Sequence, residues 1–136
     1  FNQGFMTTEL LAAALLDMEL HNLTDTDNLN VVAFEKETMD KLGLIPEIAP
    51  RYRATYFSHI IGGYAAGYYS YLWAEVLDTD AFEAFKEHGV FDKNTADSFR
   101  KNILEKGGTE DPMTLYRGFR GADPSLEPLL KNRGLK

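Results

Sequence analysis

One long stretch without a formal charge, residues 54–74, constrains the fold of this chain more than any other feature of its sequence. Its length is that of a membrane-spanning segment, which needs about 20 apolar residues. It also contains His59, Ser58 and Ser70, with three glycines and five tyrosines, and so many polar groups are costly in lipid. We therefore expect this segment to be buried in protein or to line a cleft, and we expect no membrane partner.

Length and charge exclude several classes of protein. The 136 residues leave room for one domain or for one piece of a larger domain. Lys and Arg total 14 against 21 Asp and Glu, a net charge of −7, so no nucleic-acid partner is expected. The absence of cysteine excludes disulfide scaffolds, thiol nucleophiles and cysteine metal sites. The start has no signal-peptide pattern and no initiator Met, which suggests a processed or excised chain.

The spacing of apolar residues predicts an all-α fold, because no alternating pattern is long enough for a strand. The first helix is expected to begin near the cap Thr7. A second helix is expected to begin after the cap Asn30 and to end at Gly43. The first helix has one apolar face that needs a partner surface, formed by Leu10, Leu11, Ala14, Leu15 and Met18.

Further helices are expected in the second half of the chain. One is predicted over residues 64–77, and a short one from Thr79 or Asp80 to His88. The caps Asp92, Asp111 and Asp123 are expected to begin three more helices, the first of which ends at Gly107. That first helix is expected to turn Ala96, Phe99 and Ile103 to the core and Arg100, Lys101 and Lys106 to water.

The uncharged segment concentrates phenols beside a histidine. On a helix that begins near Tyr64, the residues Tyr64, Tyr68 and Tyr71 occupy positions i, i+4 and i+7 and project from one face. Aromatic stripes of this kind more often pack in a core. Buried phenols need acceptors, however, and three of them beside His59 favour a cleft that receives peptide carbonyl groups. Such a row suits hydrogen-bond donation to a developing oxyanion.

The other polar motifs predict no site of their own. None of His21, His59 and His88 begins an H-E-x-x-H pair, so no metal ligand is assigned. His21 and His88 lie at expected helix C-termini, where a structural role is preferred. The pairs Asp25/Asp27 and Asp78/Asp80 are expected to be loop or capping residues, since the glycine and glutamate of a calcium loop are missing.

The sequence over residues 57–75 resembles the thimet oligopeptidase family of zinc metallopeptidases, and most closely its bacterial peptidyl-dipeptidases. The resemblance rests on the His-x-x-Gly-Gly-Tyr run at residues 59–64, followed by Tyr68 and Tyr71. Residues 10–17, 111–117 and 132–135 extend the likeness over essentially the whole chain.

This resemblance implies that residues 1–136 form a single helical segment, the multi-helical C-terminal portion of a zincin-like catalytic domain. The family's zinc is held by a helical H-E-x-x-H pair and a later glutamate, which are expected upstream. Zinc would then be the cofactor of the intact enzyme, none would be bound by this chain, and the chain alone would be inactive. A cytoplasmic enzyme that acts on peptides is implied, with this chain packed on the missing N-terminal part of its own enzyme.

The resemblance also implies roles for individual residues. Tyr71 and Tyr64 would be catalytic, as donors to the scissile carbonyl or the tetrahedral intermediate. His59 would bind the substrate backbone on the leaving-group side. The remaining residues expected to bind substrate are Tyr64 again, Tyr68, Gly62 and Gly63.

The sequence leaves three functions open. The first is the release of dipeptides from peptide C-termini, for which Arg51 and Arg53 are candidate partners of the substrate carboxylate by proximity in sequence alone. The second is an oligopeptidase that cuts internally in short peptides. The third is a non-catalytic helical interaction module whose tyrosine face binds another protein or simply packs.

Overall fold

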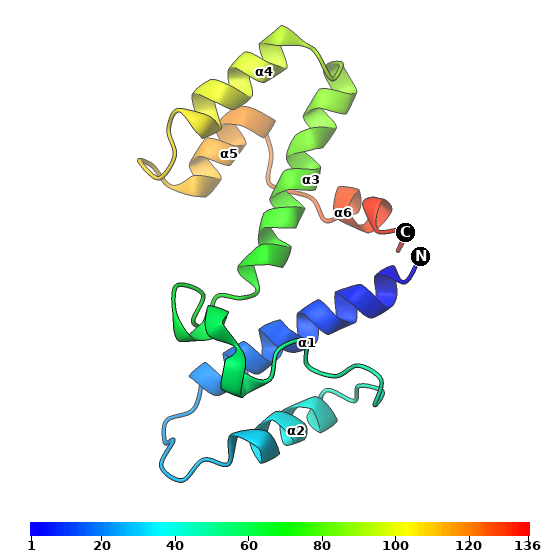
Figure 1. Cartoon of the computed structure of the whole chain (residues 1–136). Coiled ribbons are helices and arrows are strands. Elements are labelled where there is room, and N and C mark those ends of the chain that lie inside the picture. Colours follow the sequence, from blue (N-terminus) through cyan, green and yellow to red (C-terminus); the bar gives the residue numbers. More distant parts are fainter. The chain divides into compact units, whose positions relative to one another are not determined.

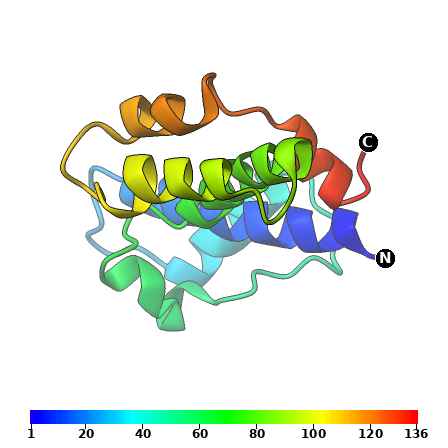
Figure 2. The same ribbon diagram turned by 90° about the horizontal axis from the view of Figure 1, so that it is seen from above.

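The computed structural model describes residues 1–136 and is helical throughout, with no β-strand. The all-α class predicted from the sequence is confirmed. The chain divides into two compact units, Phe1–Tyr71 and Leu72–Lys136 (Figures 1 and 2). None of the helices combines the length and the apolar character needed to span a bilayer.

The first unit contains α1 (Gln3–His21), α2 (Val31–Lys41) and the short 3₁₀ helices η1 (Ala54–Tyr56) and η2 (Ser58–Ile61). In Figure 1, α2 returns alongside α1, which it contacts. The predicted start of α1 near Thr7 is wrong, because the helix already begins at Gln3. No side chain caps this terminus, so the position of a capping residue does not predict where the helix begins.

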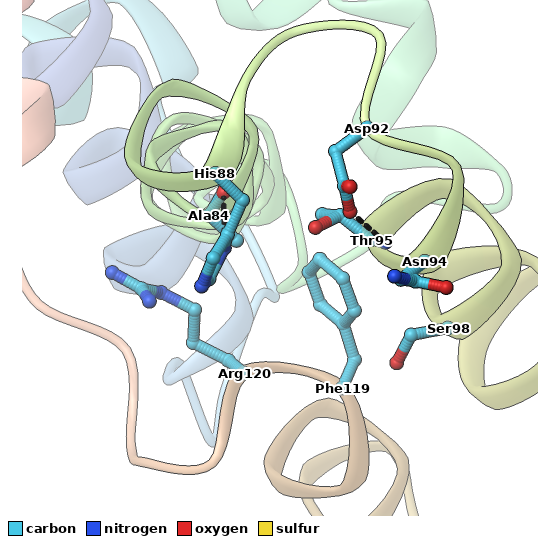
Figure 3. A pocket seen from close by; sticks show the side chains of 8 residues that line it. All are labelled: Ala84, His88, Asp92, Asn94, Thr95, Ser98, Phe119 and Arg120. Carbon is cyan, nitrogen blue, oxygen red and sulfur yellow. Dashed lines mark hydrogen bonds between the residues drawn. The ribbon is translucent and has the colours of Figure 1, made fainter.

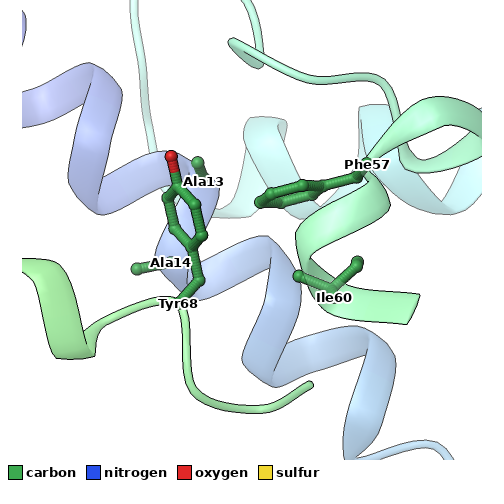
Figure 4. Packing of buried hydrophobic residues seen from close by; sticks show 5 residues of the cluster. All are labelled: Ala13, Ala14, Phe57, Ile60 and Tyr68. Carbon is green, nitrogen blue, oxygen red and sulfur yellow. The ribbon is translucent and has the colours of Figure 1, made fainter. Parts of the chain in front are cut away.

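The buried face of α1 differs from the predicted apolar stripe. Leu11, Leu15 and Met18 are 40%, 42% and 44% exposed. The buried residues are instead Ala12, Ala13, Ala14, Leu16 and Asp17. Small alanines allow close approach, and the ring of Tyr68 lies beside Ala13 and Ala14 in a cluster completed by Phe57 and Ile60 (Figure 4).

The second helix follows the prediction at both ends. The side chain of Asn30 accepts a hydrogen bond from the Ala33 N–H at 3.1 Å, and Gly43 takes a positive φ of 65° just after the helix. The buried Glu35 of α2 accepts the Ala54 N–H at 3.0 Å and pairs with Arg53. This carboxylate therefore fastens η1 to α2.

The second unit contains most of α3 (Ser70–His88), then α4 (Lys93–Phe99), the π-helical turn η3 (Arg100–Leu104), α5 (Pro112–Arg120) and α6 (Glu127–Asn132). The two helices predicted over residues 64–77 and from Thr79 or Asp80 to His88 are one continuous helix that begins only at Ser70. Thr79 does not cap, since its hydroxyl donates back to the Glu75 carbonyl at 2.7 Å.

Two of the three predicted aspartate caps are confirmed. Asp92 accepts the Thr95 N–H at 2.7 Å and Asp111 accepts the Thr114 N–H at 2.8 Å. The Asp123 cap is wrong, because this carboxylate pairs with Arg117 and α6 begins at Glu127. The predicted inward face of α4 is also wrong in part, since Ala96 is exposed and Thr95 is buried, whereas Arg100, Lys101 and Lys106 are exposed as expected.

A buried polar pair and a group of three half-buried rings join helices of the second unit. The Tyr116 hydroxyl donates to Asp80 Oδ2 at 2.6 Å, and both side chains are buried. Asp78 and Asp80 both lie within α3 and are neither loop nor capping residues, contrary to the prediction. The rings of Phe85, Phe99 and Phe119 lie within 5.2–6.2 Å of one another.

Candidate active site

The site residues singled out from the sequence converge in the first unit. His59, Tyr64, Tyr68 and Tyr71, here called the phenol–histidine cluster, have ring centroids 4.9–6.2 Å apart in five contacting pairs. Phe57 lies 5.8 Å from the His59 ring and 4.9 Å from the Tyr68 ring. The structure therefore brings the predicted tyrosines and histidine together around one point.

The backbone that places these rings is not the predicted helix. Residues 62–69 form successive turns, in which the Tyr64 N–H donates to the His59 carbonyl at 3.1 Å. Ala66 takes a positive φ of 52°, which an alanine rarely adopts. Tyr64 and Tyr68 thus reach the cluster from turns, and Tyr71 reaches it from the first turn of α3.

An unpredicted residue, Asp17 of α1, holds these turns. Its carboxylate accepts the N–H of Ala66 and the N–H of Tyr68, both at 2.9 Å, and its side chain is fully buried. Sequence reasoning missed Asp17. A usable signal existed, because it is the only charge between Leu10 and Met18, in a strongly apolar part of α1.

Two phenols of the cluster remain open to solvent. Tyr64 and Tyr71 are each 40% exposed, and their rings stack at 4.9 Å with an interplanar angle of 24°. The pKa of Tyr71 is raised to about 12, mainly by a hydrogen bond with Tyr64 and to a smaller extent by burial. Tyr71 is therefore a neutral hydrogen-bond donor throughout the physiological pH range.

Tyr68 and His59 lie deeper. The Tyr68 ring is buried, and burial raises the pKa of its phenol, an effect that the nearby Arg51 partly opposes. His59 is half-buried, and its Nδ1 atom is enclosed without a hydrogen-bond partner. The open edge of the cluster is therefore formed by Tyr64 and Tyr71, with Tyr68 beneath them.

The glycines and arginines named from the sequence lie close to the cluster residues along the chain. Neither Gly62 nor Gly63 takes a positive φ, and a Cβ atom at Gly63 would meet nothing within 4 Å. Arg53 pairs with the buried Glu35, and Arg51 Nε lies 3.8 Å from Glu9 Oε2. Both arginines therefore have carboxylate neighbours within the chain itself.

A pocket of about 410 Å³ in the second unit, lined partly by charged and polar side chains, is an alternative site (Figure 3). Three of its charged or ionisable side chains have partners within the chain. Arg120 forms two hydrogen bonds to Glu87 at 2.8 and 3.0 Å, Asp92 caps α4, and His88 Nδ1 lies 2.9 Å from the Ala84 carbonyl. These partners leave no nucleophile and base in contact, so the pocket carries no recognisable chemistry.

Both remaining histidines end helices, as predicted. His21 is the last residue of α1, and His88 is the last residue of α3. Nowhere do three or more His, Cys, Asp or Glu side chains gather in a group able to hold a metal ion. The residues present therefore do not fit a zinc site.

Comparison with known proteins identifies the family. The model of peptidase family M3 matches residues 1–135. The chain belongs to peptidase family M3. This confirms the family expected from the tyrosine and glycine motif, and M3 peptidases are zinc metallopeptidases.

Individual relatives of this M3 chain carry two kinds of name. The dipeptidyl carboxypeptidase of Escherichia coli K12 is 45% identical over 142 residues, covering 99% of this chain and 20% of the relative. The oligopeptidase A of Haemophilus influenzae is 39% identical over 137 residues, with the same coverage of both. The probable cytosolic oligopeptidase A of Arabidopsis thaliana is 40% identical over 141 residues, again covering 99% and 20%. The chain thus spans about a fifth of the length of the curated relatives it matches.

Proposed function

We propose that this M3 chain is the substrate-binding, transition-state-stabilising C-terminal part of a zinc peptidase that releases dipeptides from peptide C-termini. The observation that carries the proposal is the convergence of His59, Tyr64 and Tyr71, with two exposed phenols side by side. Membership of family M3 supports peptides as the substrates. The similarity to a dipeptidyl carboxypeptidase supports the dipeptide-releasing activity.

The chemical role of the exposed phenols follows from their protonation state. As the scissile carbonyl becomes tetrahedral, its oxygen gains negative charge. Tyr71 and Tyr64 donate hydrogen bonds to this oxygen without ionising, and the raised pKa of Tyr71 keeps its proton in place. Loss of one preorganised donor of this kind costs about 10²–10³ in rate.

The other two cluster residues bind the substrate or support the exposed phenols. The half-buried His59 contacts the peptide backbone on the leaving-group side, and Tyr68 supports the two exposed phenols from beneath. The open space above Gly63 admits a substrate backbone without a steric barrier. Neutral groups dominate this surface, so the cluster binds peptide groups by hydrogen bonding and packing.

In the proposed enzyme, zinc is bound by residues outside this chain, since the 136 residues bring no ligand set together. The isolated chain is therefore inactive. Zinc-dependent peptide cleavage by the purified chain, at a rate that contamination does not explain, would contradict this. A reading frame that continues upstream of Phe1 into an H-E-x-x-H helix is the genomic result that the proposal expects.

The exposed stripe of Leu11, Leu15 and Met18 packs on the N-terminal part of the same enzyme in this proposal. These side chains share one face of α1 and are each about 40% exposed, although apolar stripes of helices are normally covered. Self-association of the isolated chain in sedimentation experiments would agree with an uncovered surface. A compact monomer at high concentration would count against it.

The experiment that tests the proposed function replaces Tyr71 by phenylalanine in the intact enzyme. Hydrolysis of a short peptide should fall about 10²–10³-fold in kcat with zinc content unchanged. Tyr69→Phe is the matched control, because Tyr69 lies in the same segment, is 53% exposed and makes no ring contact with the cluster. Equal activity of both variants would mean that the Tyr71 hydroxyl takes no part in the reaction, and would refute the proposal.

Internal cleavage of short peptides is the second candidate activity, favoured by the relatives named oligopeptidase A. The two activities differ in their need for a free C-terminus. Amidation of an N-acetylated test peptide should strongly reduce its cleavage by a dipeptide-releasing enzyme. Unchanged cleavage of the amidated peptide would favour the oligopeptidase. A cytoplasmic location is proposed for either enzyme, supported by the relative described as probably cytosolic.

A further inference from the structure

A buried carboxylate links α1 to the cluster. Asp17 is fully buried, yet its oxygens are well satisfied: Oδ1 accepts the Ala66 N–H and Oδ2 accepts the Tyr68 N–H, each at 2.9 Å. His21 Nδ1 approaches Oδ1 at 2.8 Å as a third partner. A buried carboxylate is tolerated only with such partners, and it then fixes the groups that donate to it.

The proton of His21 is placed by its neighbours. Its Nδ1 atom lies 2.9 Å from the Asp17 backbone carbonyl and 2.8 Å from Asp17 Oδ1. Both oxygens are acceptors, so the proton must be on Nδ1, which donates to them. His21 thus acts as a donor that holds the Asp17 carboxylate in place.

The two backbone groups bound by Asp17 belong to the segment that carries the phenols. Ala66 lies two residues after Tyr64, and Tyr68 is itself a cluster member three residues before Tyr71. The positive φ of Ala66 is a conformation that a free turn does not hold without support. The two hydrogen bonds to Asp17 provide that support, over sequence separations of 49 and 51 residues.

We propose that Asp17 is a positioning residue for the reaction, one that sets the Tyr64 and Tyr71 hydroxyls at the place where the oxyanion forms. This inference rests on the proposed function of those phenols. Asp17 touches neither the substrate nor the phenol hydroxyls. It acts through the backbone of residues 66–68, whose position sets that of the phenols. Such an indirect effect is large enough to matter, since a displacement of about 1 Å at a reacting centre can cost 10²-fold in rate.

The test replaces Asp17 by asparagine in the intact enzyme. An asparagine has one acceptor oxygen and an NH₂ group, so it accepts from only one of the two backbone N–H groups and sets a donor against the other. We expect kcat to fall about 10- to 10²-fold, with KM changed less than about threefold and zinc content unchanged. Asp27→Asn is the matched control, because Asp27 is exposed and its side chain makes no contact with the cluster.

A double-mutant cycle separates positioning from general destabilisation. Once Tyr71 is phenylalanine, misplacing its hydroxyl costs nothing, so Asp17→Asn should reduce kcat clearly less in that background than in the wild type. Amide hydrogen exchange at residues 66 and 68 should be faster in Asp17→Asn. An unchanged kcat despite faster exchange, or a full multiplicative loss in the Tyr71→Phe background, would overturn the proposal.

A milder variant covers the case in which Asp17→Asn does not fold. His21→Ala removes one of the three partners of the carboxylate and leaves both backbone bonds, so a smaller fall in kcat is expected, again with KM nearly constant. An unchanged kcat with faster exchange at residues 66 and 68 would overturn the proposal here too. Failure of the proposed function looks different: Tyr71→Phe alone would then leave kcat unchanged, whatever Asp17 does.

Discussion

Replacing Phe57 by alanine should remove much of the stability of the first unit. The ring is fully buried, stacks on Tyr52 at 5.0 Å and meets Tyr68 edge-on at 4.9 Å. Burial of a phenylalanine side chain contributes up to about 3 kcal/mol, and each aromatic pair adds about 0.5–1.5 kcal/mol. We therefore expect a loss of about 3–5 kcal/mol in the free energy of unfolding, the usual range for this substitution in a core.

Urea unfolding of the 136-residue chain, followed by far-ultraviolet circular dichroism, measures this loss. Phe91→Ala is the matched control, because Phe91 is 98% exposed and its removal should change the free energy of unfolding by less than about 0.5 kcal/mol. A Phe57→Ala chain within about 1 kcal/mol of this control would refute the packing argument.

Three further predictions concern individual hydrogen bonds. Tyr116→Phe removes the donor to the buried Asp80 and should lower the free energy of unfolding by about 1.5–3 kcal/mol in the same urea assay. Tyr64→Phe removes the hydrogen bond that raises the pKa of Tyr71, so this pKa should fall from about 12 toward 10 in an ultraviolet titration; a value still near 12 would assign the shift to burial. The hydrogen bond from the Thr95 N–H lowers the pKa of Asp92 in the folded chain. This cap therefore stabilises the folded chain at pH values above the ordinary aspartate pKa, and the stabilisation is lost as the pH falls through the lowered pKa. Asp92→Asn should flatten that part of the curve of unfolding free energy against pH.

Local signals in the sequence predict local structure well. The caps Asn30, Asp92 and Asp111 each accept an N–H three residues ahead, an interaction complete within one helical turn. Asp123 has the same appearance before a proline, but its carboxylate meets Arg117 of α5 instead. A pattern that predicts a cap does not reveal a competing cation brought in by the fold.

The candidate site shows what the sequence leaves out. The convergence of Tyr64, Tyr68 and Tyr71 is correctly predicted, but from helical spacing that the chain does not use there. The Tyr68 N–H, which a helix would have used internally, donates to Asp17 51 residues away. Buried Asp80 escapes prediction for the same reason, because its partner Tyr116 lies 36 residues further on.

The central claim is that Tyr71 donates to the transition state, and a stable mimic of the tetrahedral intermediate tests it most directly. The measurement is the affinity of the intact enzyme for a peptide analogue with a tetrahedral anionic group at the scissile position, in wild type and in Tyr71→Phe. The account predicts that the variant binds the analogue about 10²–10³-fold more weakly while the substrate KM stays nearly constant. Equal affinity of the two enzymes for the analogue would contradict it.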